Sequence, residues 1–382
     1  MTAPTRTSDV SLARPASWTA ETLRNDTSWV LRLTPEEAAG FDTALDAAKA
    51  TGKHPLDMTS DDFPLPPASA TALKRAMAMT QSRFGFSLVK GLNVQRWSVE
   101  DARLAYWCMG LHLGVGRTQN RSSDYMNDVR DAGGAYKVTN GRGYNTNKGL
   151  DFHVDSCDVV ALLCLHNAMR GGTSLVTSSL ALCEEIACTR PDLLDTLRQP
   201  FFYSYQGAQD PSLPAFYKCP IQGEAQGYFA FRTNRKNITA AQDDFVQIPR
   251  LSEAQREALD LLEQLQANPR FCYAMQLDPG DLQLLNNYVV VHSRTDFEDW
   301  PEPERKRHLL RLWLTIPQSQ PLPPQWAEYY DDVRAGSVRG GLRGQAMTQQ
   351  FLDYEARQAH RCGMLYRPFQ APTTAPGTIT AA

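Results

Sequence analysis

The chain has 382 residues, a formal net charge of −3, 42% hydrophobic residues and 21% charged residues, which is the composition of an ordinary globular protein. It contains no dense run of Lys and Arg and no stretch approaching about 18 consecutive apolar residues, so we expect neither nucleic acid nor a membrane as a partner. The length fits one large catalytic domain, which we place at residues 28–365 with a core at about 80–320, between disordered ends at 1–27 and 366–382.

The cysteines indicate a reducing compartment. None of the eight forms a Cys-x-x-Cys pair, and most lie in apolar or helical surroundings, where a free thiol behaves as a small hydrophobic group. The N-terminal segment also lacks the continuous apolar stretch of a secretory signal. We therefore expect a cytoplasmic protein without a disulfide framework.

The first part of the chain predicts helices with one strand among them. Thr34 is a suitable N-cap for a helix that has acidic residues in its first turn and ends at Gly52. Two further helices are predicted at 69–85 and 98–114, and the alternating segment 86–92 between them predicts a strand.

From about residue 150 the sequence changes to short β-rich runs separated by turns, which lie at 152–165, 172–178, 200–205, 228–233, 271–277, 282–294 and 308–316. Two more helices are predicted at 179–197 and 252–266. This pattern predicts a mainly β protein with helices (α+β), in which N-terminal and inserted helices support a double-stranded β-helix, or jelly-roll, core. The helices at 35–50 and 250–266 fit packing within the chain and packing in a homo-oligomer equally well.

The segment "FHVDSCDVV" places two groups that can ligate a metal in an apolar run. His153 and Asp155 are two residues apart, so on a strand both side chains would enter the same cavity. A buried carboxylate without a partner is costly, and a metal ion would be such a partner. The His-x-Asp spacing alone is not specific, and a hydrogen-bonded strand end is the alternative interpretation.

Other groups downstream strengthen the metal hypothesis. His292 ends the apolar run "NNYVVVH", and two histidines with one carboxylate form the facial triad that holds Fe(II) and leaves the opposite face open. Arg307 and Arg311 lie in "RKRHLLRLWLTI", where an inward guanidinium is costly unless it pairs with a carboxylate. The tight turn "RGGTS" offers the hydroxyls of Thr173 and Ser174 for the same anion.

The sequence resembles the TauD/TfdA family of Fe(II)/2-oxoglutarate-dependent dioxygenases, in the branch of clavaminate synthase and γ-butyrobetaine hydroxylase. The resemblance lies in the order of four motifs, which are "HVD", "GGTS", "HSR" and the R-x-x-x-R element that begins at Arg307. The resemblance covers about residues 80–320. It implies that Fe(II), the cosubstrate 2-oxoglutarate and O2 are bound, with His153, Asp155 and His292 as the catalytic metal ligands. Arg307 would hold the distal carboxylate of 2-oxoglutarate, although Arg311 stays open for this role because the interval after His292 is longer than in those relatives.

Further residues receive roles from the resemblance. Ser174, or else Thr173, would assist 2-oxoglutarate binding, and the alternative is a turn hydroxyl. The substrate would contact Arg311, Tyr144, Asn145 and Arg232. The alternative for Arg311 is a second contact with 2-oxoglutarate, and the alternative for Arg232 is a position on the surface of a strand.

The expected reaction oxidises a C–H bond of a small carboxylate-bearing, amino-acid-like molecule, by default to an alcohol, with release of succinate and CO2. One alternative diverts the same chemistry to desaturation or ring closure. Another is a non-catalytic, cupin-like protein that binds a metal or metabolite. A third is an isomerase or metallo-hydrolase on the same fold, which would turn over without O2.

Overall fold

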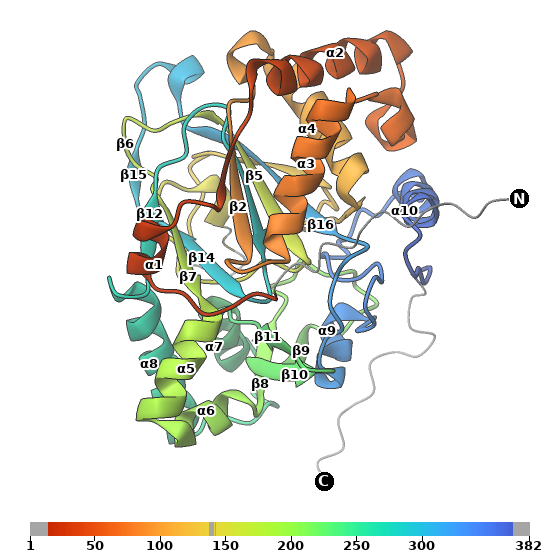
Figure 1. The fold of residues 1–382 in the computed structure, drawn as a ribbon. Helices are drawn as coiled ribbons and strands as arrows, with labels where there is room; N and C mark the ends of the chain where they lie inside the picture. The colour runs from red at the N-terminus through yellow and green to blue at the C-terminus, as the bar shows by residue number, and fades with distance from the viewer. Residues whose placement is uncertain (1–13, 137–140, 142, 370–382) are drawn as a thin grey trace, which may run out of the picture.

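The computed structural model describes residues 14–136, 141 and 143–369. Helix accounts for 37% of the described residues and strand for 21%. The protein therefore contains more helix than strand, contrary to the expectation of a mainly β protein. The difference arises because sequence reasoning missed helices at both ends of the chain and within it. The observed fold is a mixed one, in which two sheets are covered by helices (Figure 1).

The larger sheet has seven strands and forms the centre of the molecule. Its order is β1-β2-β13-β5-β16-β3, with β4 also paired to β16, and only the β1–β2 pair is parallel. The strands are β1 (Val30–Arg32), β2 (Phe86–Lys90), β3 (Val115–Gly116), β4 (Met126–Val129), β5 (Val159–His166), β13 (Leu282–Asn286) and β16 (His308–Thr315). Its central strands are buried on both faces, which explains why their sequences read as almost continuous apolar runs.

A second sheet of three strands carries half of the site described below. Its order is β12-β7-β14, with β12 at Tyr273–Met275, β7 at Ser174–Ser178 and β14 at Val290–Arg294. The single β run predicted at 282–294 is thus two strands, β13 and β14, that belong to different sheets. Short pairs complete the β structure: β6 (Arg170–Gly171) with β15 (Phe297–Glu298), β8 (Pro200–Ser204) with β9 (Phe216–Pro220), and β10 (Gln222–Ala225) with β11 (Tyr228–Phe231).

Helices cover the large sheet on one side and surround the small hairpins at the other end of the molecule (Figure 1). The first group is α2 (Pro35–Thr51), α3 (Pro67–Thr80) and α4 (Val99–Leu113), and the second is α5 (Ser179–Thr189), α6 (Pro191–Leu197), α7 (Arg235–Asp244) and α8 (Glu253–Ala267). The helix predicted at 179–197 is two helices, because the backbone of Arg190, the residue before Pro191, leaves the helical region. Both candidate interface helices pack within the chain, α2 on α3 and α4, and α8 on α5 and α6.

The remaining helices are α1 (Ala20–Asn25), α9 (Ala327–Tyr330) and α10 (Gln349–Arg361), with short 3-10 turns at Pro55–Asp57, Ser60–Asp62, Val94–Arg96, Gly143–Asn145, Pro303–Arg305 and Pro324–Trp326. Glu355 of α10 forms a fully buried ion pair with Arg117, next to β3. The C-terminal helix is thereby fixed to the edge of the large sheet.

The expectation of a disordered start is wrong for residues 14–27. Trp18 is buried and donates from Nε1 to the carbonyl of Phe84 at 2.9 Å, and α1 follows it directly. Residues 1–13 lie outside the described residues. At the other end, Arg343 stacks on Phe369 at 4.4 Å from the ring centre, and the predicted tail from 370 onward lies outside the described residues.

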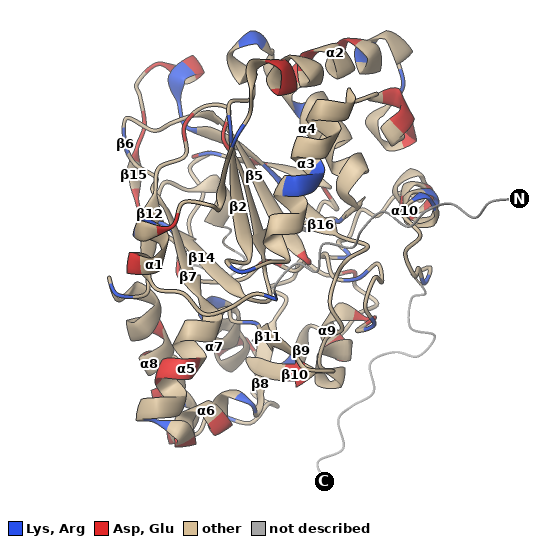
Figure 2. Ribbon diagram, in the orientation of Figure 1, with Lys and Arg blue, Asp and Glu red and all other residues tan. Residues whose placement is uncertain are grey.

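Acidic and basic residues are interspersed along the ribbon (Figure 2). Among the described residues, no helix is both long enough and apolar enough to cross a membrane.

Candidate active site

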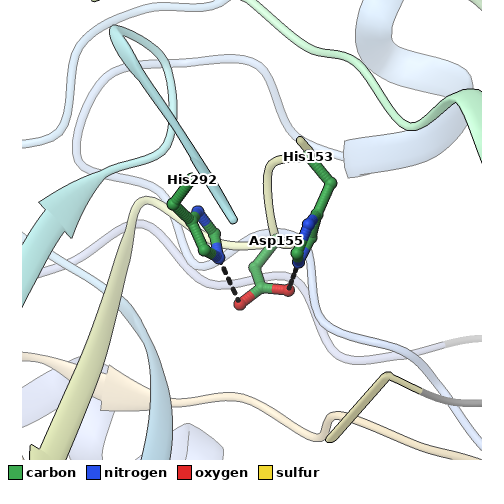
Figure 3. A group of neighbouring side chains, drawn as sticks. All are labelled: His153, Asp155 and His292. Carbon is green, nitrogen blue, oxygen red and sulfur yellow. Dashed lines mark ion pairs between the residues drawn. The ribbon is translucent and has the colours of Figure 1, made fainter. Parts of the chain in front are cut away.

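The structure brings His153, Asp155 and His292 together (Figure 3). His153 forms antiparallel bridges with both His292 and Asn234, so its backbone is held from two sides. The two imidazole rings are 4.5 Å apart between centroids, and one ligand atom from each of the three residues lies within 4.8 Å of the others. The His153 and His292 Nε2 atoms lie 3.9 and 3.7 Å from different oxygens of Asp155.

The charge states of His292 and Asp155 fit a divalent cation. Burial, followed by the proximity of His153, lowers the pKa of His292 to about 3, so this imidazole is neutral at neutral pH. Burial alone would raise the pKa of Asp155, but Arg311 and the two histidines outweigh it and hold this pKa below its usual value. The carbonyl of Asp151, 2.8 Å from Nδ1 of His153, fixes that ring with Nε2 toward the cluster. Neutral imidazoles and an ionised carboxylate are the forms that bind Fe(II).

Asp158 and His308, which lie near the metal and arginine motifs in the sequence, have different roles. Asp158 accepts hydrogen bonds from Tyr288 at 2.6 Å and Thr315 at 2.7 Å and is buried in a structural network. His308 pairs with Asp128 at 2.8 Å, away from the metal ligands.

Arg311 lies beside the metal carboxylate. Its Nη1 is 3.4 Å from each carboxylate oxygen of Asp155, and its Nε donates to Gln119 at 2.8 Å. Its guanidinium lies 5.8 Å from the centre of the Tyr144 ring. Arg311 thus already has a carboxylate partner in the chain.

One cavity contains the three ligands and extends away from them in two directions. At one end lie Ser174, Arg294 and Arg307. Gly172 makes room for Arg307, because a β-carbon there would lie only 2.8 Å from Nε of Arg307. Burial lowers the pKa of both arginines to about 10, and for Arg294 the nearby charge of Arg307 adds to this effect. This end is therefore positively charged and fits a dicarboxylate cosubstrate.

At the other end Arg232 lies among tyrosines. The His153–Asn234 bridge places Arg232 across from Asp155 in the same register, and alternation turns both side chains toward the cavity. The Arg232 guanidinium lies 3.9 Å from the ring centre of Tyr329 and 5.0 Å from that of Tyr217.

The remaining predicted residues are divided between the cavity and its surroundings. Tyr144 lines the cavity, whereas Asn145 and Thr173 are not among the lining residues in the described part of the chain. The carbonyl of Asn145 instead accepts from the amides of Ala132 and Gly134. The Thr173 hydroxyl donates to Gln276 at 3.5 Å, and the Thr173 amide donates to the hydroxyl of Thr295 at 3.0 Å.

Arg294, Lys236 and Tyr329 are among the cavity residues that sequence reasoning missed. Arg294 follows His292 by two residues, so strand periodicity could have identified it. Lys236 is bonded to the carbonyl of Gly141 and lies 4.9 Å from the Tyr136 ring centre. Tyr329 comes from a distant segment, and no local signal in the sequence indicates it.

Comparison with known proteins agrees with this geometry. Residues 48–313 match the family described as taurine catabolism dioxygenase TauD, TfdA family. FR-33289 synthase of Streptomyces rubellomurinus (strain ATCC 31215) is 30% identical over 260 residues, which cover 66% of this chain and 76% of that protein. Uridine-5'-phosphate dioxygenase of Amycolatopsis sp is 26% identical over 236 residues, which cover 57% of this chain and 82% of that protein.

Solved structures show the same fold at lower identity. Asparagine oxygenase (AsnO) superposes with a TM-score of 0.60 at 18% identity, covering 81% of this chain and 99% of that one. The non-heme iron oxygenase OrfP, in complex with Fe and alpha-ketoglutaric acid, superposes with a TM-score of 0.54 at 18% identity, covering 75% and 94%. With the family match and the His–Asp–His cluster, these findings establish that the chain belongs to the TauD/TfdA family of Fe(II)- and 2-oxoglutarate-dependent dioxygenases.

Proposed function

We propose that the protein hydroxylates a C–H bond of a small, carboxylate-bearing, amino-acid-like molecule and releases succinate and CO2. The observation that carries this proposal is a single cavity with the metal ligands between two positively charged ends. One end would take 2-oxoglutarate and the other the substrate, which places the substrate beside the open face of the metal.

His153, Asp155 and His292 would hold Fe(II), which supplies the activation of O2 when bound. Arg307 would pair with the distal carboxylate of 2-oxoglutarate, and Ser174, at the same end of the cavity, would donate a hydrogen bond to it. The contribution of the chain is to bind and orient the two organic molecules and to keep water from the reacting carbon.

Arg232 is the proposed anchor for the substrate carboxylate. Its side chain is only 2% exposed, and it has no acidic partner among the ion pairs of the described residues. Its Nη2 donates to the Tyr217 hydroxyl, while Nε and Nη1 have no hydrogen-bond partner by distance and angle among the described residues. Tyrosine rings offset part of the cost of burying this cation, and an anionic ligand would satisfy the rest. Arg311 and Tyr144, between this end and the metal, would contact the part of the substrate that reacts.

The named complexes of similar structures support an amino-acid-like substrate. One asparagine oxygenase structure contains 2S,3S-3-hydroxyasparagine and succinate, and an OrfP variant structure contains (3S)-hydroxy-L-Arg. One relative is named a uridine-5'-phosphate dioxygenase, so the test below includes phosphate esters as well as carboxylates.

We further propose that the seven-stranded and three-stranded sheets are the two halves of a double-stranded β-helix within one domain. The likeness to asparagine oxygenase supports this arrangement, as does the position of the metal ligands between β14 and the segment before β5. We propose a cytoplasmic location because all eight cysteines are free thiols, which is typical of a reducing compartment.

The test is to measure succinate formed by the Fe(II)-loaded protein with 2-oxoglutarate and O2 in the presence of amino acids, other small carboxylates and phosphate esters. We expect a carboxylate to stimulate succinate release and to gain one oxygen atom. Arg232→Gln should raise the KM for that substrate by about 10- to 100-fold, the effect of one charge-assisted hydrogen-bonded pair, and leave the KM for 2-oxoglutarate unchanged. Arg170→Gln, at an exposed arginine, is the matched control. Stimulation by phosphate esters alone would overturn the carboxylate assignment, and turnover without O2 would overturn the reaction.

A further inference from the structure

Arg294 lies at the cosubstrate end of the cavity, beside residues already assigned there. It is directly paired with Ser174 in the β14–β7 ladder, so the two side chains project from the same face of the sheet. It follows His292 by two residues on β14, which turns both side chains into the cavity. The guanidinium groups of Arg294 and Arg307 lie 4.7 and 5.0 Å from the centre of the same Phe297 ring.

The hydrogen bonds of Arg294 are only partly satisfied. Its Nη2 donates to the carbonyl of Thr146 at 2.9 Å and to that of Lys148, whereas Nε and Nη1 have no partner within the described residues. Nη1 of Arg307 is also without a partner there, and neither arginine forms an ion pair in that part of the chain. Two buried guanidinium groups with unused N–H donors require an anion.

A carboxylate has about four acceptor positions and can therefore bind more than one guanidinium. A carboxylate held by Arg307 and Ser174 would lie within reach of the unused donors of Arg294, because Arg294 adjoins both residues. We propose that Arg294 is a second guanidinium for the distal carboxylate of 2-oxoglutarate and a positioning residue that couples occupancy of this site to segment 143–150. This inference rests on the proposed role of Arg307.

The coupling follows from what else Arg294 holds. Besides its bonds to Thr146 and Lys148, its own carbonyl accepts from the amide of Leu150 at 3.0 Å. This segment carries Tyr144, whose ring faces Arg311, and it leads into Asp151, whose carbonyl orients His153. A carboxylate bound to Nε and Nη1 fixes the guanidinium and thereby the carbonyl groups attached to it. Binding of 2-oxoglutarate therefore orders segment 143–150, which contributes Gly143, Tyr144 and Leu150 to the cavity lining.

The test measures 2-oxoglutarate binding and hydrogen exchange in the anaerobic Mn(II)-loaded protein, without turnover. The variants are Arg294→Gln, Arg294→Lys and Arg307→Gln, with exposed Arg170→Gln as the matched control. We expect 2-oxoglutarate to protect the amides of residues 143–150 in the wild type and in the control. Arg294→Gln should weaken 2-oxoglutarate binding by about 10-fold and abolish that protection even at saturating 2-oxoglutarate. Arg307→Gln should weaken binding more, yet retain the protection at saturation.

Arg294→Lys keeps the charge but cannot bond the two carbonyls and the carboxylate together, so it should restore part of the affinity and none of the protection. If Arg294→Gln does not fold, Arg294→Lys alone decides the question by the same two measurements. Wild-type affinity together with wild-type protection in the folded Arg294 variants would overturn the inference. Failure of the wild-type protein to bind 2-oxoglutarate would instead overturn the proposed function on which it rests.

Discussion

Nη1 of Arg311 lies 3.4 Å from both carboxylate oxygens of Asp155, and Nε2 of His153 and of His292 lie 3.9 and 3.7 Å from the same carboxylate. Arg311 therefore helps to keep Asp155 ionised and correctly oriented for a metal ion. This relationship adds a role to a residue whose position in the R-x-x-x-R element indicated only contact with an anionic ligand.

Arg311→Gln should weaken Fe(II) binding by about 10- to 100-fold, since residues that orient a metal ligand have effects of this size. The measurement is an anaerobic metal titration without 2-oxoglutarate or substrate. Unchanged metal affinity combined with a raised KM for substrate would assign Arg311 to the substrate alone.

Asp155→Ala removes one of three metal ligands and should abolish 2-oxoglutarate turnover. The far-UV circular dichroism spectrum should stay that of the wild type, while the loss of the partner of Arg311 lowers the free energy of unfolding by about 1–3 kcal/mol. Asp195→Ala, at an exposed aspartate, is the control. Turnover at the wild-type rate in Asp155→Ala would refute the metal triad.

Gly172→Ala should raise the KM for 2-oxoglutarate by about 10-fold or more, because the added β-carbon would displace Arg307 from the carboxylate. Gly172 has a φ of +66°, so the substitution also strains the backbone. Gly52→Ala separates the two effects, since Gly52 has a φ of +61° and no atom within 4 Å of the added carbon. Equal effects of the two substitutions on 2-oxoglutarate binding would show that Gly172 does not position Arg307.

The metal-free protein should lose stability as the pH falls below about 6.5. In the unfolded chain His292 binds a proton near this pH, whereas its pKa in the folded chain is about 3. The unfolded state therefore binds more protons between these values, and the free energy of unfolding decreases by up to about 1.4 kcal/mol per pH unit from this residue. The pKa of Asp155 is lowered in the folded chain, so its contribution to stability is lost only at still lower pH.

Urea unfolding of metal-free protein between about pH 7 and 4.5 measures this dependence. In His292→Gln, the free energy of unfolding should change less with pH over this interval. His54→Gln, at an exposed histidine, should keep the pH dependence of the wild type. A wild-type slope retained in His292→Gln would assign the titration to other groups.

The metal ligands could be predicted because they lie in two short motifs, and the chemistry of their side chains is readable without the fold. His153 and Asp155 project together although they precede β5 rather than lie in it, because the bridges to His292 and Asn234 give this segment a strand-like course. Arg307 and Ser174 were predicted through the resemblance to a family. Arg294 was overlooked, although its spacing from His292 is the same as that of Asp155 from His153.

What escaped prediction depends on contacts between distant segments. Tyr329 reaches Arg232 across almost a hundred positions of the chain, and Glu355 fixes α10 through Arg117. The helix α10 does have local signals, an N-cap at Thr348 and buried residues at helical spacing, which sequence reasoning did not use. Its packing partner is visible only in the folded structure.

The two bridges that hold His153 also affect how the enzyme responds to a shortage of iron. Because hydrogen bonds to β14 and to the segment before α7 fix the backbone of this ligand, its place does not depend on the ion. A protein molecule that loses its iron keeps the ligands close to their final positions, and reloading requires no refolding.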